Sequence, residues 1–130
     1  MKALKRSDLL YPELSYRIIG ILFEIDNKLG HGYRERYYQE ALSSAFKSTN
    51  LLFQEQVPIV LNFNGRETGK SFVDFIIEDK IILEIKRGER FFRSNIDQIY
   101  SYLRITGLKL GILVNFTNKG LQFKRIVNIN

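Results

Sequence analysis

Two short runs rich in β-branched and aromatic residues, separated by only three positions, constrain the fold of this chain most strongly. The runs are SFVDFII, residues 71–77, and IILEIKR, residues 81–87, and both have the composition of β-strands. So short a connection joins neighbouring antiparallel strands. A helical pattern follows the second run. That run should therefore lie between a hairpin partner and a crossover helix, in the centre of a sheet covered on both faces.

Charged residues interrupt the second run at regular spacing. Strand alternation places Glu84 and Lys86 on one face together with Ile82, while Leu83 and Ile85 point to the other face. One interpretation is a half-exposed strand whose outer face carries a solvated acid and base. A central, covered strand favours a different interpretation, because a buried carboxylate needs a partner or a metal ion.

Asp74 interrupts the first run, where its neighbours are apolar, although strands disfavour aspartate. Asp74 and Glu84 share a face only if paired positions of the two strands sum to an even number. Pairing these two residues leaves Glu78-Asp79-Lys80 as a three-residue loop, whereas a two-residue turn would separate the acids. We expect the three-residue loop or an equivalent bulge.

The remaining segments predict a single domain over residues 1–130, with residues 1–12 as a loose N-terminal segment. Helical spacing runs from Pro12 to Leu29, and again from residue 33 or 34 to about residue 50. Strands are expected at residues 51–63, 71–77, 81–87, 108–116 and 121–129, with a turn-rich segment at 64–70 and a helix at 95–106. This order predicts an α/β fold of the α+β type, in which two N-terminal helices and one crossover helix pack on a mixed five-stranded sheet.

Composition narrows the chemistry of any site. The 130 residues include 20 Lys and Arg against 14 Asp and Glu, a net charge of +6, which favours a polyanionic partner such as nucleic acid. The absence of cysteine and the single histidine exclude thiolate chemistry and multi-histidine metal sites, so a metal here needs oxygen ligands. No stretch approaches 18 apolar residues and no leader pattern opens the chain, so we expect no membrane span and a cytoplasmic location.

Two converging carboxylates would need relief from their mutual repulsion. At about 4 Å apart they repel by roughly 4 kcal/mol at an effective dielectric constant of about 20, and a proton or a cation must compensate. Mg²⁺ suits the oxygen ligands, with Mn²⁺ as an alternative, because it binds through one or two carboxylates, waters and substrate phosphate. Lys86 would then orient the attacking water or stabilise the transition state.

Four short motifs, taken in order, resemble a known family. They are Gly32-x-x-Glu35-x-x-Tyr38, Asp74, Glu84-Ile85-Lys86 and Gln98-x-x-x-Tyr102-Leu103, spread over residues 14–127. Together they resemble the GxxExxY proteins of the PD-(D/E)xK nuclease superfamily. Val73 and Asn95 depart from the pattern, where proline and often histidine are expected.

The resemblance implies a restriction-endonuclease-like α/β/α core whose five strands lie in sequential order, with the second and fifth running against the rest. It further implies that Asp74 and Glu84 hold Mg²⁺, that Lys86 is the active-site lysine, and that Glu35 and Gln98 border the same pocket.

Several supporting residues carry two interpretations each. Glu35 opens a helix, where it would also stabilise the helix dipole, and Gly32 is expected at positive φ between the two N-terminal helices. Tyr38 and Tyr102 are expected to support the site from their helices. Residues 87–93 combine the cations Arg87, Arg90 and Arg93 with the aromatic residues Phe91 and Phe92. The segment is either a nucleic-acid contact or a solvated loop with its aromatic side chains folded inward.

The leading functional hypothesis is a Mg²⁺-dependent nuclease that hydrolyses phosphodiester bonds of DNA, or alternatively RNA, by metal-activated water. The alternative is a catalytically silent module of the same fold that binds nucleic acid or a protein partner. A third hypothesis is a small anion-binding regulatory protein. A homodimer would help the protein to grip a duplex, although no residue in the sequence points to one.

Overall fold

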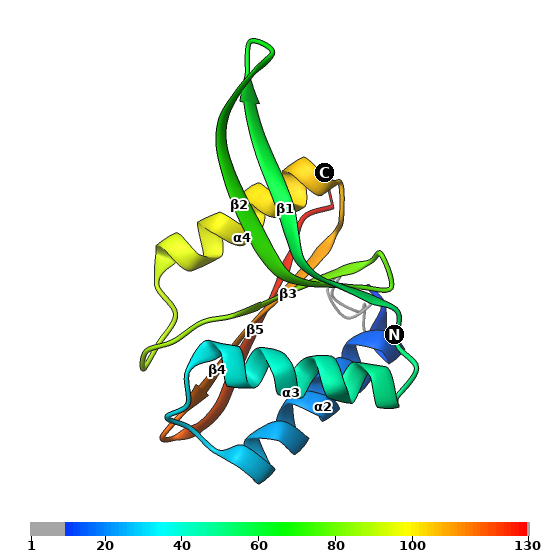
Figure 1. Ribbon diagram of the computed structural model, residues 1–130, viewed down its shortest axis with the longest axis vertical. Helices are drawn as coiled ribbons and strands as arrows, with labels where there is room; N and C mark the ends of the chain where they lie inside the picture. The colour runs from blue at the N-terminus through cyan, green and yellow to red at the C-terminus, as the bar shows by residue number, and fades with distance from the viewer. Residues whose placement is uncertain (1–9, 130) are drawn as a thin grey trace, which may run out of the picture.

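The computed structural model describes residues 10–129, in which three helices and five strands follow the expected order (Figure 1). The elements are α2 (Pro12–Leu29), α3 (Glu35–Ser48), β1 (Phe53–Phe63), β2 (Arg66–Ile77), β3 (Ile81–Ile85), α4 (Arg93–Thr106), β4 (Leu110–Thr117) and β5 (Gly120–Val127). Pro12 opens α2, where its missing N–H costs nothing. Gly107 ends α4 in the left-handed region at φ 77°, as expected for a residue just past a helix.

The five strands form one mixed sheet in the order β1-β2-β3-β4-β5. β3 and β4 are parallel, and every other neighbouring pair is antiparallel. Consequently β2 and β5 run against the other three strands. The sheet order and the strand directions confirm the predicted fold class, and α4 is the crossover connection between the two parallel strands.

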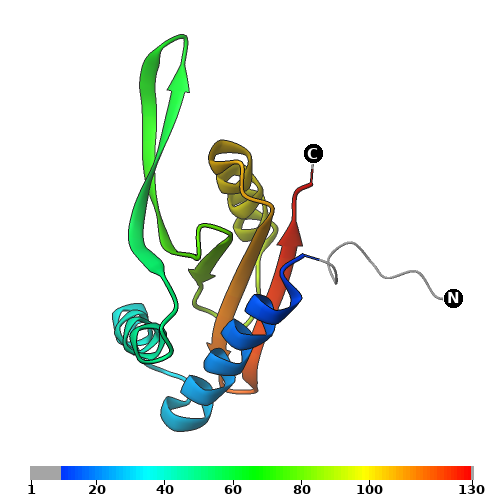
Figure 2. The same ribbon diagram turned by 90° about the vertical axis from the view of Figure 1, so that its right-hand side faces the viewer.

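Helices cover both faces of the sheet (Figures 1 and 2). α2 and α3 pack on one face over a core that includes Leu83 and Ile85, and α4 packs on the other over a core that includes Ile82. All five residues of β3 are buried. The expected central, doubly covered strand is therefore present, with the predicted alternation of its side chains.

The predicted loop between β2 and β3 is confirmed. Ile77 pairs with Ile81, and Glu78 and Asp79 both adopt positive φ in the connection of residues 78–80. The paired positions sum to an even number, which is the parity that Asp74 and Glu84 require to share a face.

The prediction of a turn-rich segment over residues 64–70 was wrong in extent. The turn consists of Asn64 and Gly65, both at positive φ, as in the two-residue Asn-Gly turns that match the twist of a hairpin. β2 already begins at Arg66. As a result the β1–β2 hairpin is long, and its distal part projects beyond the rest of the molecule (Figures 1 and 2).

Most of the expected loose segment, residues 1–9 of 1–12, lies outside the described residues. At its end, the carbonyl of Leu10 accepts a hydrogen bond from Arg125 Nη2 at 3.1 Å, and Tyr11 packs against the core beneath α2 and α3. No helix among residues 10–129 is both long enough and apolar enough to cross a membrane.

Candidate active site

The carboxylates of Asp74 and Glu84 lie together between β2 and β3, and each bonds to the main chain of the opposite strand. Glu84 Oε1 accepts the N–H of Asp74 at 2.6 Å, and Asp74 Oδ2 accepts the N–H of Ile85 at 2.8 Å. The main-chain pairing of the two strands runs from Ile77 to Phe75 and stops one residue before Asp74. Beyond that point, hydrogen bonds from main-chain N–H groups to the two carboxylates take the place of main-chain bonds between the strands. The strands separate there, and both carboxylates lie between them.

A distortion of β1 accompanies this opening of the sheet. Gln56, opposite Asp74, has φ 49°, an unusual value for a residue other than glycine. Its Nε2 donates to Asp74 Oδ1 at 3.2 Å. Gln39 of α3 accepts from the same Nε2 group at 3.3 Å and donates to the main-chain oxygen of Asp74, also at 3.3 Å. The two glutamines thus hold Asp74 from the side opposite Glu84.

Lys86 follows β3 and joins the acids to α4. Its main-chain N–H donates to the carbonyl of Val114 at 2.8 Å, which extends the pairing of β3 with β4 by one residue. Its ammonium lies 3.4 Å from Glu84 Oε2 and donates to Gln98 Oε1 at 2.8 Å. The structure therefore brings Asp74, Glu84, Lys86 and Gln98 into one connected cluster, as the sequence pattern predicts.

Burial dominates the electrostatics of the two acids. The pKa of Glu84 is raised from 4.5 to about 7, mainly by burial and next by the charge of Asp74, while the N–H of Asp74 and the charge of Lys86 oppose the shift. Burial also raises the pKa of Asp74, against the hydrogen bonds from Ile85 and Gln56. The lysine therefore compensates the acidic pair only in part, and a further cation would stabilise both ionised carboxylates.

Glu35 begins α3 at the border of this cluster. Its side chain as a whole is exposed, yet desolvation at its carboxyl and, next, the charge of Asp74 raise its pKa, while Lys86 and Arg87 lower it. Glu35 is therefore close enough to respond to the charges of the cluster, in line with its expected position at the margin. Glu35 is also the first residue of α3, where a carboxylate interacts favourably with the helix dipole, so the second interpretation of this residue applies as well.

The supporting residues Gly32, Tyr38 and Tyr102 have structural contacts. Gly32 has φ 97° in the connection between α2 and α3, as expected. Tyr38 donates to the carbonyl of Gly30 at 2.6 Å and stacks on Phe116 with ring centres 4.2 Å apart. The hydroxyl of Tyr102 shares a 2.6 Å hydrogen bond with Ser71 of β2. These tyrosines fix α3 and α4 against the sheet on either side of the cluster.

The arginine segment 87–93 is exposed except at Phe91, and its two aromatic residues have different surroundings. Phe91 packs against the core beneath α4, whereas Phe92 is exposed and lies under the Arg90 guanidinium at 5.3 Å. Arg93 forms an exposed ion pair with Asp97 at 3.5 Å. The inward packing of Phe91 agrees with the solvated-loop interpretation, whereas the contact with nucleic acid stays a prediction.

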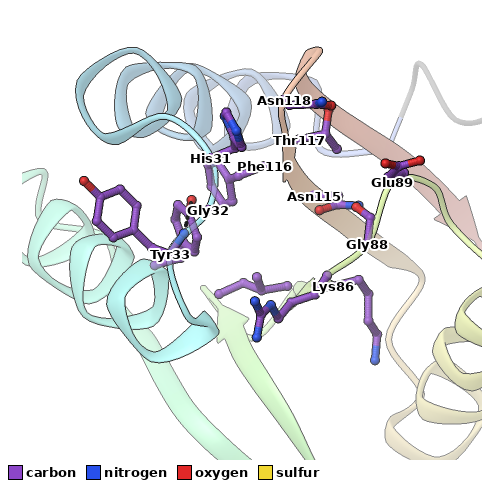
Figure 3. Close-up of a pocket in the computed structure, with 13 residues that line it drawn as sticks. His31, Gly32, Tyr33, Lys86, Gly88, Glu89, Asn115, Phe116, Thr117 and Asn118 are labelled. Atoms are coloured by element: carbon purple, nitrogen blue, oxygen red, sulfur yellow. Dashed lines mark hydrogen bonds between the residues drawn. The ribbon is translucent and has the colours of Figure 1, made fainter.

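A hollow of about 270 Å³ opens beside Lys86, at the carboxyl ends of β3 and β4 (Figure 3). It is bordered by the loop of residues 31–33, by residues 85–89 and by residues 115–118. Its wall includes Asn115, which is only 2% exposed and donates from Nδ2 to the carbonyl of Gly88 at 2.5 Å. The hollow thus extends the cluster toward the loop between α2 and α3.

Sequence reasoning missed three polar residues of this region: Gln39, Gln56 and Asn115. Asn115 interrupts an apolar strand as Asp74 does, and that signal could have identified it. Gln39 lies one helical turn after Glu35, so its position was also available from spacing. Gln56 depends on a backbone distortion that no sequence pattern indicated.

The carboxylate oxygens of Asp74 and Glu84 are ligands of the kind that a hard divalent cation prefers. Within residues 10–129 no group of three or more His, Cys, Asp or Glu side chains is placed to hold a metal ion. A cation would therefore take oxygen atoms from Asp74 and Glu84 and complete its shell with water and a substrate phosphate, as Mg²⁺ commonly does. Each carboxylate oxygen has a second lone pair beyond the hydrogen bonds described above.

The family comparison assigns the class of protein. Residues 12–126 match the model of the PD-(D/E)XK nuclease superfamily. The match extends over most of the chain, and the chain belongs to the PD-(D/E)XK nuclease superfamily. Nucleases of this superfamily generally use divalent metal ions, and their substrates are nucleic acids.

Solved structures support the restriction-endonuclease-like fold. The crystal structure of SSO0001 is similar with a TM-score of 0.58 and 23% identity over 95% of this chain, which spans 62% of that chain. An alkaline exonuclease from Laribacter hongkongensis is similar with a TM-score of 0.53 and 14% identity over 98% of this chain and 72% of its own. At these identities the likeness is one of fold. No curated protein matches significantly.

Proposed function

We propose that this protein is a Mg²⁺-dependent nuclease whose active site consists of Asp74, Glu84 and Lys86, with Glu35 and Gln98 at its border. One observation carries the proposal. The buried carboxylate of Glu84 and the half-buried carboxylate of Asp74, on neighbouring strands, interrupt the sheet ladder next to a lysine that α4 holds in place through Gln98. Two carboxylates that are close together and shielded from water destabilise the fold when both are ionised. A role in binding a cation would explain why they lie there.

Asp74 and Glu84 are the proposed ligands, for Mg²⁺ or alternatively Mn²⁺. When bound, the cation would neutralise charge on a phosphate oxygen and lower the pKa of water enough to yield a nucleophile near neutral pH. The two acids are already oriented by main-chain N–H groups, so little reorganisation accompanies binding.

Lys86 is proposed to face the reacting phosphate. Its ammonium has three donors, and Glu84 and Gln98 engage two of them. The third donor can stabilise negative charge that develops on the phosphate, or orient the attacking water. Glu35, whose pKa is raised by desolvation and by Asp74, can accept a proton or a hydrogen bond from that water.

The substrate is proposed to be DNA, with RNA as the alternative. Arg87 and Arg90 are exposed beside the site, and Arg93 lies at the start of α4. The hollow in Figure 3 offers room for a nucleotide next to the reacting phosphate, with Tyr33 and Lys86 among its lining residues. The assignment to the GxxExxY group and a cytoplasmic location remain predictions of the sequence.

Cleavage assays test the proposal. Purified protein is incubated with single-stranded, duplex and branched DNA and with RNA, in Mg²⁺, Mn²⁺ or EDTA. We expect cleavage that requires the metal, that Glu84→Ala abolishes, and that Lys86→Ala lowers by about 10²–10³-fold, the usual effect of removing one transition-state donor. Lys47→Ala is a matched control, because Lys47 is exposed at the opposite end of α3 from Glu35.

Two results would contradict the proposal. Cleavage that survives both site variants would come from a contaminating enzyme. Salt-sensitive binding of nucleic acid without cleavage under any of these conditions would instead favour a catalytically silent binding module.

A further inference from the structure

The distal half of the β1–β2 hairpin is a two-stranded ribbon that contacts little else. We call residues 60–70 the distal ribbon. In both views it rises beyond α4 and the other strands (Figures 1 and 2). Ten of these residues are exposed and Gly69 is partly buried, whereas Ile59 and Val73 below the ribbon are buried against α4. An isolated two-stranded ribbon is only marginally stable, so a ribbon of this length requires explanation.

The distal ribbon exposes apolar and cationic side chains together. Phe63 at the turn is 68% exposed and pairs across the hairpin with Arg66. Val60 and Leu61 are exposed as well, and Lys70 lies 5.5 Å from the ring of the exposed Phe72 just below the ribbon. Arg66 and Lys70 outnumber the single acid, Glu67, so the ribbon is net positive.

The β1 edge of the hairpin is interrupted just below the distal ribbon. β1 is the edge strand of the sheet, but Pro58 lacks an N–H and Gln56 has positive φ. A register shift next to Leu61 leaves Thr68 as an extra residue on β2. These features oppose addition of a strand from a second copy or from a protein partner.

Duplex nucleic acid fits this surface better than a protein does. A two-stranded ribbon is narrow enough to enter the major groove, and an exposed arginine and lysine can contact phosphates on its walls. An aromatic residue at the tip can pack against bases or sugars. The ribbon also continues directly from β2, the strand that carries Asp74, so a duplex that runs along β2 from the proposed site can reach it.

We propose that the distal ribbon binds the duplex arm of the substrate beyond the active site and thereby sets a minimum arm length for tight binding. This inference rests on the proposed nuclease function. Eight residue steps separate Arg66 from Asp74 along β2, which at about 3.3 Å per step amounts to roughly 26 Å. That reach corresponds to at most about eight base pairs of B-form DNA.

The test compares binding of duplexes shorter and longer than this reach. Fluorescence anisotropy in EDTA, over a range of salt concentrations, measures affinity for a 6-base-pair and a 24-base-pair DNA. For the long duplex, Arg66→Ser should reduce the slope of log affinity against log salt by about 1, as for the loss of one phosphate contact. Phe63→Ser should weaken binding of the long duplex severalfold. Both variants should bind the short duplex as the unaltered protein does.

Lys47→Ser is the matched control, since it removes the same charge from an exposed position on α3. Unchanged slope and affinity in both ribbon variants would overturn the inference, while metal-dependent cleavage by the unaltered protein would leave the proposed function intact. If Phe63→Ser converts a dimer to a monomer in sedimentation with DNA affinity unchanged, the ribbon serves a second copy and the inference fails. An unaltered protein that neither binds nor cuts nucleic acid would overturn both proposals.

Discussion

Asp74 and Glu84 replace main-chain hydrogen bonds between their strands, which is how two acids can remain in a covered part of the sheet. Each carboxylate satisfies an N–H group that the separated strands would otherwise leave without its ladder partner. Only Lys86 lies within ion-pair distance of Glu84 among the described residues. The remaining desolvation cost appears in the raised pKa of Glu84, about 7.

This raised pKa predicts a pH dependence of stability. In the unfolded chain Glu84 ionises near 4.5, but in the fold it keeps its proton until about pH 7. Without metal, the contribution of Glu84 to the free energy of unfolding is therefore most favourable below pH 4.5. It falls by up to about 3 kcal/mol as the pH rises from there through 7. Urea unfolding in EDTA should show Glu84→Gln gaining stability relative to the unaltered protein between pH 4.5 and 8.

The difference between the two proteins is the informative quantity, because most other titrating groups cancel in it. A difference that stays constant across this pH range, or that shifts in favour of the unaltered protein at pH 8, would contradict the assignment of a desolvated Glu84.

At the level of elements, the position of α4 determines where Lys86 points, because Gln98 belongs to that helix. α4 packs very closely on β4 at Gly111. A Cβ atom placed on Gly111 would lie 2.5 Å from Cγ2 of Ile99, in the helix. The contact atom belongs to a β-branched side chain with little freedom to move, so only glycine allows this approach.

Gly111→Ala should therefore push α4 away from the sheet. We expect a loss of about 1–3 kcal/mol in the free energy of unfolding, the usual cost of overpacking, together with reduced nuclease activity. Gly20→Ala is the control, since Gly20 is exposed within α2 and a Cβ there meets nothing within 4 Å. It should stabilise the protein by about 0.5–1 kcal/mol. Equal unfolding midpoints for Gly111→Ala and the unaltered protein in denaturant titrations would refute the close packing.

The same elements show how far sequence reasoning extends. The register of β2 and β3 was predictable, because a three-residue connection and the period of a strand leave one parity that places both acids together. The extent of the β1–β2 hairpin was not, because polar residues and glycine in residues 64–70 are compatible with either a loop or a solvent-exposed ribbon. The support from Gln56 depends on tertiary contacts, which periodicity does not record.

At the level of the whole molecule, the proposed site lies where three layers meet. β2 and β3 supply the acids and the lysine, α4 supplies Gln98 from one face, and α3 brings Glu35 from the other. The distal ribbon and the hollow beside Lys86 extend the surface in two directions from this point. The chain spans only 62% of the SSO0001 chain, so the comparison covers this domain-sized region rather than that whole protein.

The central claim is that Asp74 and Glu84 together hold one divalent cation, and equilibrium Mn²⁺ binding tests it most directly. The free-ion signal in electron paramagnetic resonance gives the bound fraction without any substrate. At pH 8 we expect one site per chain in the unaltered protein, its loss in Asp74→Asn, and its retention in the control Glu40→Gln on the exposed surface of α3. Mn²⁺ binding of the same stoichiometry and affinity in Asp74→Asn would contradict the account.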